Sequence, residues 1–457
     1  MKAWTHVILL GLLFFALPSS AQDYILVGET YNAKVSKIDP VTNAKSASIR
    51  VADSIGVPVP NIARIVLDTV HNWVFVACNT GNAISVIDLH TWTATYPPIS
   101  VPGMGLHPKG LAISADGSRL YAGTEGTDGV QDSTDPLDII SVTGNTFPPT
   151  LSLVSSVPCG KQPTNVVVSH DGKYAVVSCR NQARVAVVDL TGDSLIYRYN
   201  YPNTTYEPEG LDIHPTENLV YCTTHGQNTI DILNLDSMKI VSSIPISYTA
   251  PPPQPSGGVF SPDGKQFLLS AQTSGRLYFF NTTDPLNPVQ SPTYITSGGI
   301  QPHMGVFLND TLAYIPNTNN TQPVGSVAIV TTGQIPVNIG NVTGTFNGPL
   351  SIILVKDSTA VQVTRQDIAQ TEDYQIKISP NPFHSSATLA FYLPRPGFVT
   401  LKIFDVLGKE IIILLNGKLA AGNHQVEFKG GQLPDGLYFC RLSTPQGVRS
   451  KYLELIK

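Results

Sequence analysis

Short apolar runs separated by Gly, Pro and polar residues fill most of the chain between residues 22 and 355. Residues 161–190 show this pattern most clearly, because an apolar run at 165–169 follows Pro163 and reads like a fully buried strand. The next four residues, His170-Asp171-Gly172-Lys173, predict a tight hairpin. Further strands are expected at 174–179 and 184–190, with a weaker fourth run at 194–200. The block therefore predicts four short antiparallel strands.

This block recurs along the chain, and each copy opens with a proline. The gaps between successive prolines are 48, 55, 45, 47, 47 and 47 residues. Four short strands at such a period are typical of a β-propeller blade, and frequent Gly and Pro exclude long helices. The seven prolines are Pro60, Pro108, Pro163, Pro208, Pro255, Pro302 and Pro349.

The two ends of the repeat region complete each other. Residues 349–355 read as a first strand with nothing after it, whereas 24–28 and 34–39 read as second and third strands with no first strand before them. Pairing them builds a last blade and removes exposed sheet edges. We therefore predict an all-β fold whose residues 22–355 form a seven-bladed β-propeller, closed by pairing N- and C-terminal strands. Six or eight blades are the alternatives.

The repeat also carries family motifs. Pro-x-Gly before the apolar run, Ser-x-Asp-Gly in the hairpin and Ile-Asp at the end of the third strand recur between about residues 23 and 355. This pattern resembles the YVTN-type β-propeller repeat of bacterial and archaeal surface proteins. The resemblance is specific for the fold and only loosely tied to function, because related members include surface-layer proteins and lactonase-like propellers.

After Val355 the pattern changes. Residues 356–375 are polar without a strand period and are expected to be a linker. Residues 376–457 contain six or seven short alternating runs, which predict a small Ig-like β-sandwich.

Ordered motifs in this last segment resemble the type A C-terminal sorting domain of type IX secretion substrates. The resemblance implies export by the Sec route and then through the type IX translocon, which would be a partner of residues 376–457. The protein would then be released or attached at the surface of a Gram-negative bacterium. An ordinary Ig-like binding module is the alternative. The motif residues are Pro380, Asn381, Pro382, Phe383, Gly408, Lys409, Pro434, Gly436 and Tyr438.

Residues 1–21 are typical of a signal peptide. Lys2 is followed by an apolar stretch at 7–17 and by the small residues Ser19-Ser20-Ala21. That stretch is shorter than the ~20 apolar residues that span a bilayer. An uncleaved anchor is the alternative, and no transmembrane segment is expected in the mature chain.

The charge and cysteine content of the chain argue against nucleic-acid binding and against a cysteine metal site. Charged residues are 13% of the chain, the net charge is −5 and no basic block occurs, so nucleic acid is not an expected partner. The five cysteines lack the paired spacing of a metal site, and Cys78, Cys179 and Cys222 are expected to be buried. No metal site or cofactor is predicted.

The polar residues that would surround the mouth of the central channel are the candidate site. They occupy two equivalent positions in each blade: the residue after the repeat proline, and a residue in the loop between the second and third strands. The first position gives Asn61, Lys109, Thr164, Glu209, Ser256, His303 and Leu350. The second gives Glu29, Asn79, Glu125, Arg180, His225, Gln272 and Asn317.

Several chemistries fit this mixed set. Arg180, Lys109 and the histidines suit an anionic ligand. The glutamates with His225 or His303 suit a divalent metal or acid–base catalysis. Structural roles in the loops are the simpler interpretation. No G-x-S-x-G, H-E-x-x-H or P-loop motif occurs. We therefore expect a binding or structural envelope protein without enzymatic activity, with a lactonase-like hydrolase or a metal-binding propeller as alternatives.

Overall fold

The computed structural model describes residues 23–52, 61–126, 134–318, 325–332, 336–342, 344–356, 377–393, 397–404, 410–431, 433–444 and 447–456. They form two compact units, one within residues 22–356 and one after residue 356. The predicted signal peptide, the predicted linker beyond Lys356, and the motif residues Gly408 and Lys409 lie outside the described residues. No helix in the described part of the chain has the length and apolar character needed to cross a membrane.

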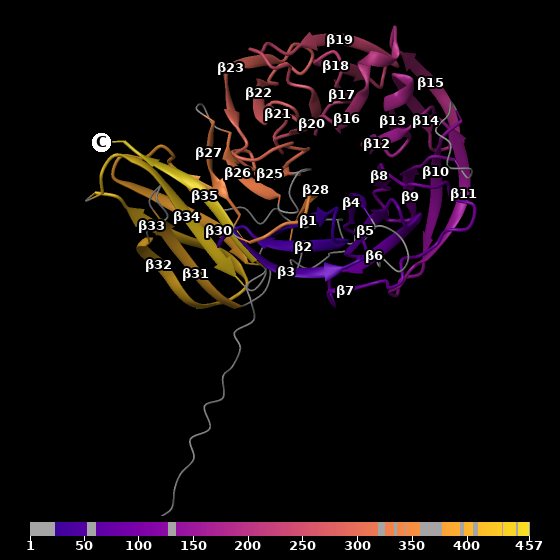
Figure 1. Ribbon diagram of the computed structural model, residues 1–457. Coiled ribbons are helices and arrows are strands. Elements are labelled where there is room, and N and C mark those ends of the chain that lie inside the picture. The colour runs from indigo at the N-terminus through magenta and orange to yellow at the C-terminus, as the bar shows by residue number, and fades with distance from the viewer. Residues whose placement is uncertain are drawn as a thin grey trace, which may run out of the picture. The chain divides into compact units, whose positions relative to one another are not determined.

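The described residues of the first unit form seven four-stranded antiparallel sheets, arranged as the blades of a propeller (Figure 1). The innermost strands are β28 (Pro349–Val355), β4 (Ile62–Asp68), β8 (Leu111–Ile113), β12 (Pro163–Val168), β16 (Pro208–Ile213), β20 (Pro255–Phe260) and β24 (Val306–Asn309). In this order each innermost strand contacts the next, and β24 contacts β28, so the ring is closed.

The other three positions of each blade follow outward from the channel. The second strands are β1 (Tyr24–Glu29), β5 (Trp73–Cys78), β9 (Arg119–Gly123), β13 (Tyr174–Cys179), β17 (Leu219–Thr224), β21 (Gln266–Ala271) and β25 (Leu312–Asn317). The third strands are β2 (Lys34–Asp39), β6 (Ala83–Asp88), β10 (Pro136–Thr143), β14 (Arg184–Asp189), β18 (Thr229–Asn234), β22 (Arg276–Asn281) and β26 (Ser326–Thr331). The outermost strands are β3 (Ala44–Arg50), β7 (Thr93–Ala94), β11 (Thr150–Pro158), β15 (Ser194–Asn200), β19 (Lys239–Pro245), β23 (Val289–Thr296) and β27 (Val337–Asn341). Two short 3-10 helices, η1 (Arg180–Gln182) and η2 (Thr204–Tyr206), lie in loops.

The ring closes as the sequence predicts. Strand β28 pairs antiparallel with β1, and Tyr24 lies opposite Val355. The Ser351 hydroxyl also accepts a hydrogen bond from the Ile65 backbone N–H at 3.1 Å, which ties this composite blade to the next one. The first and last strands of the propeller are therefore hydrogen-bonded neighbours.

The most buried strands are the second and third of each blade, not the first. Every residue of β5 and β6 is buried, whereas β12 has partly accessible residues at three of its six positions. The expectation that the first strand is fully buried is therefore wrong. The reason is geometric: the middle strands pack between two neighbouring blades, whereas the innermost strand has one edge on the channel. All five cysteines are buried and unpaired.

Glycine allows the innermost strands of two neighbouring blades to approach closely. A Cβ placed on Gly210 of β16 would lie only 2.3 Å from the Cα of Gly257 of β20. No rotamer change can relieve a clash with backbone, so the packing of these two blades requires glycine here.

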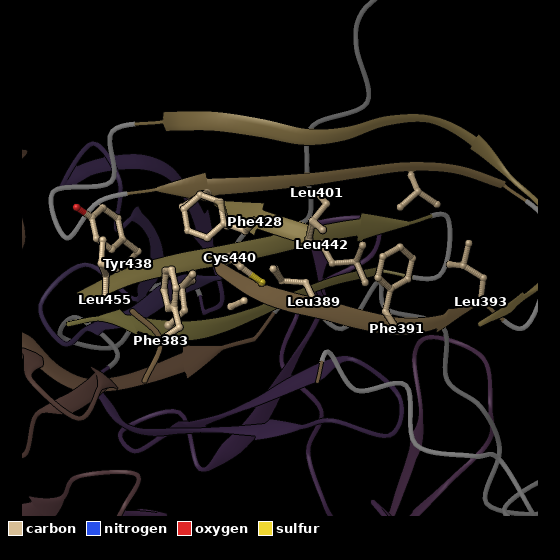
Figure 2. Close-up of a cluster of buried hydrophobic side chains, with 14 residues drawn as sticks. Phe383, Leu389, Phe391, Leu393, Leu401, Phe428, Tyr438, Cys440, Leu442 and Leu455 are labelled. Carbon is tan, nitrogen blue, oxygen red and sulfur yellow. The ribbon is translucent and has the colours of Figure 1, made fainter. Parts of the chain in front are cut away.

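The second unit is a β-sandwich. One sheet contains β29 (Lys377–Ser379), β30 (Ser386–Leu393) and β33 (Gly422–Lys429), and the other contains β31 (Gly397–Phe404), β32 (Glu410–Leu419), β34 (Gly436–Thr444) and β35 (Gly447–Leu455). A cluster of buried side chains from both sheets fills the space between them (Figure 2). Phe383 is fully buried in this cluster and packs edge-on against Phe428, with ring centroids 5.7 Å apart.

Candidate functional site

All seven blades contribute to one cavity of about 270 Å³ at an end of the central channel. Each blade supplies the residue that follows its repeat proline, so these seven sequence-predicted residues do meet. The lining is Thr30, Asn61, Ile62, Ala63, Arg64, Asn79, Lys109, Thr164, Glu209, Ser256, His303, Met304 and Leu350.

Hydrogen bonds from one blade to the next surround this cavity. Thr30 donates to the Ile62 carbonyl at 2.6 Å, and Asn79 donates to the Pro108 carbonyl at 3.3 Å. Ser256 donates to the Pro302 carbonyl at 2.7 Å. In each case a polar side chain satisfies a carbonyl at the start of the next blade's innermost strand or in the segment that leads into it. Part of the polarity of the mouth therefore has a structural purpose.

Of the seven residues predicted from the second-to-third loops, only Asn79 lines the cavity, although Thr30, next to Glu29, also does. Glu29 is fully buried, and its carboxylate accepts hydrogen bonds from Ser36, from Lys45 Nζ at 2.6 Å and from the Asn347 backbone N–H at 2.8 Å. Burial raises the pKa of Glu29, but these hydrogen bonds outweigh it and the pKa is lowered. Glu29 is thus a buried anion that joins the strands of the closing blade.

Arg180 and His225 belong to an ion-pair network beside the cavity. Arg180 lies 2.9 Å from Glu207 and 3.2 Å from Glu209, and His225 Nδ1 lies 3.1 Å from Glu207. The contact with Glu209 lacks hydrogen-bond geometry, so Glu209 Oε2 has no hydrogen-bond partner among the described residues. Burial raises the pKa of Glu209 in spite of the Arg180 charge.

The remaining predicted residues are spread over several blades. Lys109 Nζ forms a 2.8 Å ion pair with Glu125, whose other oxygen lies 2.8 Å from His107 Nδ1. Asn317 is buried and donates to the Ser326 hydroxyl at 3.2 Å. The backbone N–H of Gln272 donates to the Gln254 carbonyl. A ligand-binding role for Glu125, Gln272 and Asn317 stays a prediction, and none of the three lines the cavity.

Arg64 lines the cavity and was not anticipated from the sequence. Together with Asp212 it occupies the fourth position after the repeat proline, where the other five repeats have Ala112, Val167, Val259, Val306 and Ile353. Two charged residues in an otherwise apolar column of the repeat were the available signal. Glu209 and Asp212 both attract the Arg64 charge.

Burial moves the pKa values of two groups near Arg64 in opposite directions. It raises the pKa of Asp212 to about 7. It lowers the pKa of His303 to about 4, helped by the positive charge of Arg64. His303 is therefore neutral at neutral pH and offers hydrogen bonds rather than charge.

This arrangement suits binding better than the alternative chemistries. In the described ranges, no three His, Cys, Asp or Glu side chains gather to hold a metal ion. The metal site built on Glu29, Glu125 and Glu209 with a histidine is therefore not assembled. The hydrolase alternative needs His225, His303 and Arg180 at one mouth, but only His303 lines the cavity.

The sorting-motif residues have structural roles in the second unit. Phe383 forms part of the core, and the Tyr438 hydroxyl donates to the Pro434 carbonyl at 2.8 Å. Gly436 begins β34 with a φ of 146°, which favours glycine. Pro380 and Pro382 are exposed, and Asn381 is partly buried.

Comparison with protein families identifies this second unit. Residues 377–454 match the secretion system C-terminal sorting domain. This type IX sorting domain indicates that the protein is secreted or lies at the outer-membrane surface.

Comparison with solved structures supports the propeller fold. A functionally unknown protein from Desulfotomaculum acetoxidans superposes with a TM-score of 0.52 at 13% identity, over 73% of this chain and 99% of that one. A candidate 6-phosphogluconolactonase from Bacteroides fragilis superposes with a TM-score of 0.56 at 13% identity, over 74% of this chain and 99% of that one. At such identities the likeness concerns the fold alone. No curated protein matches the chain by sequence.

Proposed function

We propose that this chain is an exported YVTN-type propeller that binds a small ligand in its channel-mouth cavity and does not transform it. One observation carries the proposal: all seven blades place the residue after the repeat proline around a single cavity of about 270 Å³. A volume just below the ~300–1,000 Å³ of drug-sized ligand pockets suits a metabolite-sized molecule.

The export route completes the proposal. Residues 1–21 direct the chain through the inner membrane by the Sec route, and the sorting domain engages the type IX translocon. The propeller then presents its cavity outside the cell, either released or attached to the surface.

A ligand screen on the purified protein tests this function. The thermal midpoint is followed with a panel of small metabolites, and at least one class is expected to raise it, because a ligand that binds only the folded state stabilises that state. Leu350→Trp fills the cavity and abolishes the shift. Val337→Trp, at an exposed position of β27, leaves the shift unchanged.

Two outcomes contradict the proposal. A shift that survives Leu350→Trp places the ligand elsewhere. Robust turnover of lactones or esters that Leu350→Trp abolishes makes the protein an enzyme.

A further inference from the structure

Arg64 brings to the cavity a guanidinium group that no described carboxylate contacts directly. Its Nη1 and Nη2 atoms lie 3.7 and 3.9 Å from the Met304 sulfur, and no ion pair of Arg64 occurs among the described residues. A thioether is a weak acceptor, so most of the five guanidinium donors lack a good partner. Arg64 is partly buried, and even partial burial of a charged group that makes few hydrogen bonds costs free energy.

The other cations near the cavity are neutralised by carboxylates. Lys109 is paired with Glu125, and Arg180 is paired with Glu207 and Glu209. His303 is uncharged at neutral pH. Within the described ranges, Arg64 is therefore the cation of the cavity that lacks a direct ion pair, and Glu209 and Asp212 act on its charge without contacting it.

An unsatisfied acceptor lies on the other side of the ring. Glu209 Oε2 lies 3.2 Å from Arg180 Nη1 but accepts no hydrogen bond from the described residues, and Glu209 lines the same cavity. Its strand β16 is three blades from β4, which is the largest separation that a ring of seven allows. The apolar residues Ile62, Ala63 and Leu350 lie on the adjacent strands β4 and β28.

We propose that the cavity binds a small carboxylate that also carries a hydrogen-bond donor, either a hydroxyl or an ammonium group. The ligand carboxylate pairs with the Arg64 guanidinium, which can hold both of its oxygens. The donor group reaches Glu209 Oε2, and the hydrocarbon part contacts the apolar residues of β4 and β28. This inference rests on the proposed binding function and names the chemistry of its ligand.

Four three-carbon probes separate the parts of this proposal by calorimetry on the full chain. Propionate has the carboxylate alone, lactate adds a hydroxyl, alanine adds an ammonium group, and lactamide lacks the charge. We expect lactate or alanine to bind more tightly than propionate, and lactamide not to bind. Whichever of lactate and alanine binds more tightly identifies the donor.

Two substitutions assign the contacts. Arg64→Gln weakens carboxylate binding roughly ten- to hundredfold, as the loss of a charged hydrogen bond predicts. The matched control Arg276→Gln, which removes a guanidinium stacked on Tyr294 at the rim, leaves binding unchanged. Glu209→Ala removes the advantage of the donor-bearing probe over propionate.

The thermal stability of an Arg64 variant tests the role of this charge independently of ligand binding. Because Arg64 is a partly buried charge without an ion pair, Arg64→Met should raise the thermal midpoint of the ligand-free protein while carboxylate binding is lost. A lower midpoint makes Arg64 a structural residue and overturns the inference.

The outcomes also separate this inference from the proposed function. Binding of a neutral probe that Leu350→Trp blocks, but Arg64→Gln does not affect, retains the binding function and overturns the ligand class. Absence of binding by all four probes likewise overturns the ligand class, and the wider metabolite panel then decides the function.

Discussion

Titration of Asp212 and of His303, both near Arg64, should change the stability of the fold in opposite directions as the pH rises. The folded-state pKa of Asp212 is about 7, above its ordinary value of 3.8. The folded state therefore holds this proton more tightly than the unfolded state, and the stability of the fold decreases as the pH rises from about 4 to 7. The folded-state pKa of His303 is about 4, below its ordinary value of 6.5, so the stability of the fold increases as the pH rises through that interval. Between about pH 4 and 6.5 the two contributions partly cancel.

Single substitutions should expose each contribution. Asp212→Asn leaves only the pH dependence that His303 causes, so the thermal midpoint should rise more steeply between pH 4.5 and 6.5 than in the unmodified protein. His303→Gln leaves only the pH dependence that Asp212 causes, so the thermal midpoint should rise less steeply or fall over the same range. Thermal unfolding monitored by circular dichroism at several pH values measures both slopes. Variants that shift the midpoint equally at every pH would contradict this account.

The sequence predicted one of the two sets of residues at the channel mouth correctly, in the sense that they line one cavity. The residues after the repeat prolines converge because each proline occupies the same place in its blade. The second-to-third-loop residues were less predictable, because Glu29, Arg180 and His225 have partners contributed by distant segments that a repeat alignment does not reveal. Arg64 was missed because an apolar residue is expected in the middle of an innermost strand.

Among the elements, the blades differ most at their outer edges. Strand β7 has only two residues, Thr93–Ala94, whereas β11 has nine. Outermost strands face solvent and contribute least to the core, so their lengths vary most freely. The sequence predicted the blades because the proline period and the apolar middle strands are the parts that packing constrains.

The contact between β16 and β20 allows a sharp test of packing. Gly210→Ala would place a methyl group 2.3 Å from the Gly257 Cα, so we expect a loss of stability of about 1–3 kcal/mol. Gly192→Ala is the matched control, because its nearest neighbours would lie 3.7 Å from the added Cβ. Chemical denaturation measures both. Equal stabilities of the two variants would show that the blades separate easily.

Closure by β28 can be tested by truncation. A propeller that ends at Lys356 should fold and unfold cooperatively, since residues 22–356 form a compact unit. A chain that ends at Gly348 lacks β28, exposes the edge of β1 and should aggregate or lose its cooperative transition. Size-exclusion chromatography and thermal unfolding distinguish the two. A monomeric, equally stable shorter chain would contradict the importance of closure.

For the whole molecule, the sorting domain joins folding to export. Phe383 lies in its core, so Phe383→Ala should destabilise this unit by about 3–5 kcal/mol and reduce the exported fraction. Gly417→Ala is the control, because a Cβ there meets no atom within 4 Å. Immunoblots of fractionated cells measure the export. Unchanged export of the Phe383→Ala variant would show that recognition does not need this core.

The pairing of β1 with β28 also has a consequence for biogenesis. Tyr24 and Val355 are 331 positions apart (355 − 24), so the blade that the ribosome starts first is the one completed last. Until then a nascent propeller keeps an open edge that invites self-association. The sorting domain follows the closing strand in the sequence. A polypeptide that ends before β28 therefore lacks both the strand that closes the ring and the sorting domain. The order of synthesis alone would then keep such incomplete propellers from being exported.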